Sequence, residues 1–190
     1  MKTISNEKNE SEKQELTNLL NMPLLKKHIL VLVTLVEKKP DLLPLVFEIL
    51  KSEKQHDVMV ASWLLSHLWD SSPGLLKPWQ FQIVQQVLVT KFDSVRRNLL
   101  RILDGLPILP DQMGILFDAC LGWMISDNYA IAVRCNAMQI LYRVCCIEPA
   151  LIQEVRQHIE VLLEYGTAGF QSRGKKVLKQ FDILTSKQCY

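Results

Sequence analysis

One apolar pattern, with residues spaced i, i+4 and i+8, recurs along this chain at offsets of 35, 35, 38 and 37 residues. The successive sets begin at Leu25, Val60, Val95, Val133 and Phe170, and the last set keeps only its outer positions, Phe170 and Leu178, with Gly174 between them. Residues four apart lie on one face of an α-helix, and a period of this length is typical of stacked helical pairs. Since one helical pair cannot bury its own apolar stripe, the pattern predicts that successive pairs pack against each other.

A second apolar-periodic segment precedes each of these helices. The preceding segments cover about residues 11–20, 41–52, 76–91, 110–125 and 149–165. Turn residues such as those at 38–41 and 71–74 separate the helices, and the alternating pattern of β-strands is weak. We therefore predict an all-α fold, a right-handed α-α superhelix of about five helical pairs. It forms a single domain over residues 11–190, after a polar flexible tail over residues 1–10.

Two second helices open almost identically, with SVRRNLLRIL at 94–103 and AVRCNAMQIL at 132–141. An apolar-Arg opening, followed four positions on by a small or apolar residue, resembles the second helix of HEAT and armadillo-like repeats. The resemblance covers residues 11–185 and implies an α-solenoid whose second helices line a concave binding face. The family's acidic residue six positions before the Arg is replaced by Thr90 and Asn128. A regular Asp–Arg ladder between repeats is therefore not expected.

A buried stripe predicts which side chains of each second helix face outward or into the groove. Outward positions without a predicted binding role include Ser62, Ser66, Asp70, Asp104, Cys135, Gln139 and Ser172. The predicted binding residues are Trp63, Trp69, Arg97, Asn98, Arg101, Asn136, Tyr142, Arg143, Arg173, Lys176 and Lys179. Arginine holds carboxylates or phosphates bidentately, and tryptophan anchors a peptide or stacks on bases. The alternative is that the tryptophans belong to the core and the basic residues form a solvated face.

The sequence shows no motif for metal, nucleotide or catalytic chemistry. The histidines, at His28, His56, His67 and His158, lack zinc-ligand spacing, and neither a Gly-rich phosphate loop nor a Gly-x-Ser-x-Gly turn occurs. The cysteines are Cys120, Cys135, Cys145, Cys146 and Cys189, an odd number without a Cys-x-x-Cys pair, as in reduced cytoplasmic proteins. No apolar run approaches the ~20 residues that span a membrane. We predict a cytoplasmic protein without a cofactor, a metal site or enzymatic activity.

These patterns predict a non-enzymatic scaffold that binds a protein partner, acidic or extended, in its concave groove. The alternative is a nucleic-acid-binding protein related to the HEAT-like DNA glycosylases that remove alkylated purines, which hold aromatic residues and a carboxylate in a basic groove. The carboxylate is the weaker part of that resemblance, because His67 stands one turn after Trp63, while Asp70 and Asp104 come at helix ends. A third possibility is a purely structural element of a larger assembly.

Overall fold

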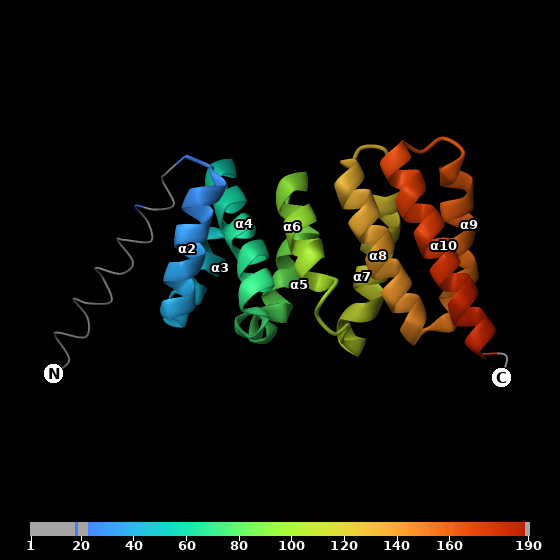
Figure 1. Ribbon diagram of the computed structural model, residues 1–190, viewed down its shortest axis with the longest axis horizontal. Coiled ribbons are helices and arrows are strands. Elements are labelled where there is room, and N and C mark those ends of the chain that lie inside the picture. The colour runs from blue at the N-terminus through green and yellow to red at the C-terminus, as the bar shows by residue number, and fades with distance from the viewer. Residues whose placement is uncertain (1–17, 19–22, 189–190) are drawn as a thin grey trace. The chain divides into compact units, whose positions relative to one another are not determined.

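The computed structural model describes residue 18 and residues 23–188, and every regular element in this part of the chain is a helix (Figure 1). The predicted tail over 1–10 lies outside the described residues, as does the predicted first helix over 11–20 apart from Asn18. The helices form two compact units, residues 1–102 and residues 103–190, each described here by itself. Among the described residues, no helix combines the length and apolarity needed to cross a membrane.

The first unit contains α2 (Lys26–Lys38), α3 (Leu43–Ile49), α4 (Gln55–Ser71), α5 (Gln80–Val89) and most of α6 (Asp93–Leu103). Two first helices, α3 and α5, are shorter than predicted because the chain enters them through 3-10 turns. These turns, Pro40–Leu42 and Lys77–Trp79, contain prolines, which fit the first positions of a helical turn and lack the amide hydrogen that a helix interior needs.

The second unit contains α7 (Pro110–Ile125), α8 (Ile131–Ile147), α9 (Ile152–Leu163) and α10 (Ala168–Gln188). A 3-10 turn, Pro149–Leu151, leads into α9. Helix α8 packs against both α7 and α10, and α10 also packs against α9. The second helix of one pair therefore contacts the second helix of the next, as the repeat pattern predicts.

The predicted apolar stripes form the core of both units. Val60, Leu64 and Leu68 of α4 are almost completely buried, and so are the equivalent residues of α6 and α8. The pattern weakens at its ends, where Leu25 is 47% exposed and Leu178 is half-buried. Burial of the repeated stripe confirms the predicted helix faces, because the same period that places these residues on one face also directs them towards neighbouring helices.

The repeated Val-Arg opening places a buried arginine at the turn within a helical pair. In the first unit, Arg96 is 6% exposed, and its guanidinium donates hydrogen bonds to the backbone carbonyl of Thr90 and, at 3.0 Å, to Asp93 Oδ1. Thr90 directly follows the last residue of α5, so the arginine satisfies a carbonyl that has no partner within that helix.

Arg134 has the same place in the second unit. Its Nε donates to the backbone carbonyl of Met124 at 3.0 Å, in the last turn of α7, and its guanidinium forms an ion pair with Asp127. The acidic partner thus stands seven residues before Arg134, rather than six, where Asn128 stands. Both buried arginines join the helices of one pair, which explains why the chain repeats this opening.

The described cysteines are free thiols with contrasting exposure. Burial raises the pKa of the Cys120 thiol, and burial next to Cys146 raises the pKa of Cys145 to about 12. Burial also raises the pKa of Cys135, which the charges of Arg173 and Arg134 partly oppose. Because the thiolate is the reactive form, these environments slow alkylation, whereas Cys146 is exposed.

We therefore expect iodoacetamide, at about pH 8 in the folded state, to modify Cys146 well before Cys120 or Cys145. Peptide mass spectrometry of the digested chain identifies each site by its own fragment. Unfolding in urea before labelling is the control, since all three thiols should then react at similar rates. Equal labelling of Cys120 and Cys146 in the folded protein would contradict the burial of α7 against its neighbours.

Candidate functional site

The candidate site is the second-helix surface, which comprises the predicted outward residues of α4 and α6 in the first unit and of α8 and α10 in the second. Exposed members are Arg97, Arg101, Lys176 and Lys179, and half-buried members are Trp63, Trp69, Asn136, Tyr142, Arg143 and Arg173. Asn98 is buried. That all these residues line one concave groove stays a prediction.

The outward orientation predicted for Asn98, Ser62 and Ser66 is wrong, because these residues are 7%, 0% and 4% exposed. They lie where α4 meets α6. The side-chain amide of Asn98 donates to Ser62 Oγ at 3.2 Å, and the guanidinium of Arg101 donates to the carbonyl and Oγ of Ser66, at 3.1 and 2.7 Å. The bonded residues are 36 and 35 positions apart, so this polar contact follows the repeat period.

An ionic and aromatic cluster forms on the first unit around His67, which is not among the predicted binding residues. Its ring lies 6.0 Å from that of Trp63, and its Nδ1 is 3.8 Å from Asp70 Oδ2. Burial lowers the pKa of His67; Asp70 opposes this shift, while Lys26 and Arg101 add to it. The signal available in the sequence was spacing, since Trp63 and Asp70 lie four and three positions from His67 on one helix.

The carboxylate of Asp70 is already paired within this cluster. Arg101 donates to Asp70 Oδ1 at 2.5 Å, and the two side chains are 48% and 44% exposed. The charges of Arg101 and Asp70 therefore offset each other. This pairing weakens the resemblance to the DNA glycosylases, which need a carboxylate directed at a ligand. It also means that Arg101 is not a free cation that could bind an anionic ligand.

In the second unit, Arg143 and Tyr142 make contacts within the protein. The guanidinium of Arg143 donates to the carbonyls of Leu103 and Leu106, at 2.6 and 2.5 Å, where α6 ends and the loop to α7 begins. The ring of Tyr142 packs against Phe181 with centroids 5.5 Å apart. A hydrogen bond with Cys146, together with burial, raises the pKa of Tyr142. These contacts stabilise the turn and the α8–α10 packing, so neither side chain is free for an anion.

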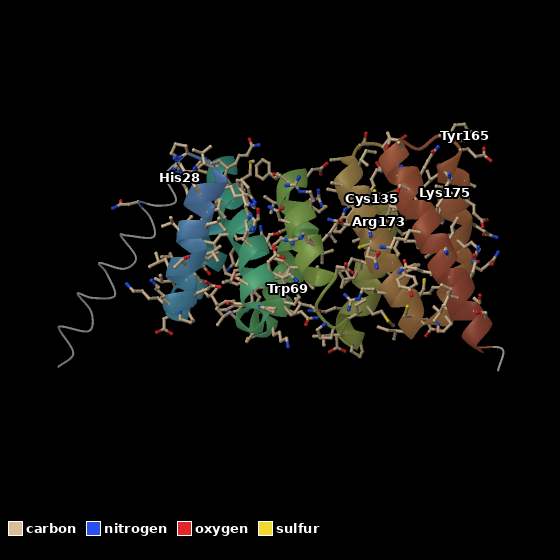
Figure 2. The ribbon with its side chains drawn as sticks, in the orientation of Figure 1. His28, Trp69, Cys135, Tyr165, Arg173 and Lys175 are labelled. Atoms are coloured by element: carbon tan, nitrogen blue, oxygen red, sulfur yellow. The ribbon has the colours of Figure 1, made fainter. Side chains whose placement is uncertain are left out.

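The basic residues of α10 divide into a paired arginine and a set of unpaired lysines. Arg173 donates to Gln139 Oε1 at 3.0 Å, which holds it on the α8 side of α10 (Figure 2). Lys175, Lys176 and Lys179, which we call the lysine face, are exposed and form no ion pair with any residue that the structure describes. The nearest acidic residue along α10, Asp182, is paired with Arg156 of α9.

No cluster of three or more His, Cys, Asp or Glu side chains that could hold a metal ion occurs within residues 23–188. The arrangement instead offers ammonium groups to an anionic partner on α10. On the first unit it offers the ring pair of Trp63 and His67 beside a neutralised ion pair.

Comparison with known proteins adds one finding. A family model described as a HEAT repeat domain matches residues 16–181, which include most of both units. Comparisons with curated proteins and with solved structures gave no match. The match agrees with the all-α solenoid architecture, in which paired helices recur with the period seen in the sequence and in the hydrogen bonds between repeats. The chain belongs to the HEAT repeat domain family.

Proposed function

We propose that this chain is a non-enzymatic scaffold that binds an acidic segment of a partner protein through the lysine face of α10. HEAT repeat proteins are helical-repeat scaffolds and are generally not catalysts, which supports the first half of the proposal. The lysine face supports the second half. A cytoplasmic location is part of the proposal and rests on the free thiols of the described cysteines.

The single observation that carries the proposal is the contrast between paired and unpaired cations. Arg96, Arg134 and Arg143 donate to backbone carbonyls, and Arg101 is paired with Asp70. Within a chain of formal net charge +2, the lysine face thus concentrates positive charge that no described acidic group offsets. Such a patch attracts an acidic partner and accelerates its association.

The helix also places an apolar side chain beside these cations. Lys176, Lys179 and Ile183 are spaced by three and four residues, so they lie on one helix face. Ile183 is 48% exposed. An acidic segment with an aliphatic side chain near its carboxylates would therefore gain both charge pairing and apolar burial on α10.

The test is a charge reversal of two lysines, Lys176→Glu with Lys179→Glu. We expect the affinity for a fluorescein-labelled, Glu-rich peptide containing one Leu to fall about tenfold or more, because attraction becomes repulsion at two positions. Fluorescence anisotropy measures the affinity. The matched control is Lys38→Glu with Lys77→Glu in the first unit, which changes the net charge equally at exposed positions outside α10. Equal losses in both double variants would refute a specific site on α10.

Nucleic acid is the alternative ligand for the same lysines, and the same assay distinguishes it. Labelled duplex and single-stranded DNA are titrated at about 50 and about 200 mM salt, because phosphate-driven binding weakens steeply over this range. Micromolar binding of DNA that collapses with salt, and exceeds binding of the acidic peptide, would replace the protein partner with nucleic acid. Flat DNA titrations with saturable peptide binding support the scaffold.

A further inference from the structure

The first unit contains an open cavity of about 700 Å³ that is not part of the second-helix surface. It lies between the turn that leads into α4 and the turn that leads into α6. Its walls are residues 51–53, Val58, residues 85–86 and residues 89–92. The volume lies in the range of cavities that accommodate small ligands or a few side chains of a peptide. We call it the turn cavity.

One part of the turn cavity is apolar, and Val89 is its exposed member. Val58 is 3% exposed, Phe92 is half-buried, and Val89, the last residue of α5, is 69% exposed. An aliphatic side chain placed among these three residues would remove the exposed part of Val89 from water, which is the source of apolar affinity.

The polar part of the turn cavity favours a negative charge. Lys91 is exposed and forms no ion pair with the described residues, and Lys51 is held only by an exposed ion pair with Glu48 at 2.7 Å. Such exposed pairs are weak and exchange readily. The lining contains two lysines, Lys51 and Lys91, and one acidic residue, Glu53, while Glu48, the partner of Lys51, lies outside the lining.

One wall of the turn cavity is held in place by a hydrogen bond between repeats. The side-chain amide of Gln86 donates to the backbone carbonyl of Leu50 at 2.8 Å, across 36 residues of sequence. This bond joins α5 to the end of the preceding first helix. The opening between the two turns is therefore preorganised, which lowers the entropy lost on binding.

We propose that the turn cavity binds an extended segment of a partner protein in which an aliphatic side chain is flanked by carboxylates. The aliphatic side chain contacts Val58, Val89 and Phe92, and a flanking carboxylate pairs with Lys91. The turn cavity and the lysine face of α10 consist of different residues, and neither depends on the other. A separate partner segment can therefore bind to each of them.

The test uses two-dimensional amide NMR spectra of the isotope-labelled full chain. The probe is a capped peptide in which Glu-Leu-Glu is flanked by Gly and Ser. We expect saturable shifts at residues 51–53 and 85–92, with half-saturation on the order of 1 mM, typical of a small contact. Peptides with Gly in place of Leu, or Lys in place of both Glu residues, should bind at least about tenfold more weakly. If the peptide with Gly binds as tightly as the original peptide, the proposed apolar contact is wrong. If the peptide with Lys binds as tightly, the proposed charge pairing is wrong.

Two variants locate the contact. Val89→Asp and Lys91→Glu should each lower the peptide affinity measured from these shifts about tenfold. Val161→Asp, at a comparably exposed valine of α9 in the second unit, is the matched control and should retain them. Absence of saturable shifts around the turn cavity would overturn this inference whatever happens on α10. Shifts confined to α10 would overturn it while supporting the proposed function, so the two failures are distinguishable.

Discussion

Replacement of Arg134 with alanine is expected to lower the free energy of unfolding by about 3 kcal/mol, since it removes several charge-assisted contacts of a buried side chain. Arg134 is 6% exposed and joins three elements of the second unit. It donates to the Met124 carbonyl of α7, pairs with Asp127 of the following turn, and lies 4.8 Å from the centroid of the Phe170 ring in α10.

The loss of stability comes mainly from the groups that lose Arg134 as their partner. The Met124 carbonyl loses its donor inside the protein, and the Phe170 ring loses a packed cation. Asp127 contributes less, because its side chain is 90% exposed and regains water. Arg134→Lys should have an intermediate effect, since it keeps the charge but loses the planar guanidinium that reaches several acceptors at once.

Urea denaturation followed by circular dichroism measures this loss. The control is Lys175→Ala, which truncates an exposed cation on α10 and should change stability by no more than about 0.5 kcal/mol. If Arg134→Ala is no more destabilising than Lys175→Ala, the buried arginine does not hold the turn between α7 and α8 as described.

Gly174→Leu is expected to destabilise the protein by about 3 kcal/mol, through overpacking between α9 and α10. A Cβ atom at Gly174 would lie 2.8 Å from Leu163 Cδ2 and 3.1 Å from Ile159 Cγ2. Gly174 occupies the middle position of the last repeated stripe, where the other second helices carry larger residues. The missing side chain therefore allows α9 to pack closely against α10.

Alanine at the same position separates two opposing effects. Gly174→Ala gains up to about 1 kcal/mol of helix propensity but must displace the flexible end of Leu163, so a change within about 1 kcal/mol of wild type is expected. Gly114 of α7, where an added Cβ would meet nothing within 4 Å, is the matched control. Gly114→Leu should leave stability unchanged or raise it. Equal effects of leucine at Gly174 and Gly114 in thermal or urea unfolding would contradict the close packing.

The sequence by itself was sufficient for the all-α architecture, the repeat and the buried faces of the helices. The stripes that begin at Val60, Val95 and Val133 are buried as predicted, and most second helices begin within a few residues of the expected positions. This information is local, because the helical period places side chains around the axis of their own helix whatever lies beside it. The predicted lengths of the first helices were less accurate, because prolines form separate 3-10 turns before α3 and α5.

Only the tertiary structure decided which polar residues of the second-helix surface are available for binding. Asn98 and Arg143 have the spacing of outward residues, yet Asn98 bonds to Ser62, and Arg143 bonds to one carbonyl at the end of α6 and another in the loop that follows. Lys176 and Lys179 have the same kind of spacing and stay unpaired among the described residues. The reason is physical: spacing sets the direction of a side chain from its own helix. The neighbouring helix or turn, brought near by packing, determines whether that side chain finds a partner or faces water.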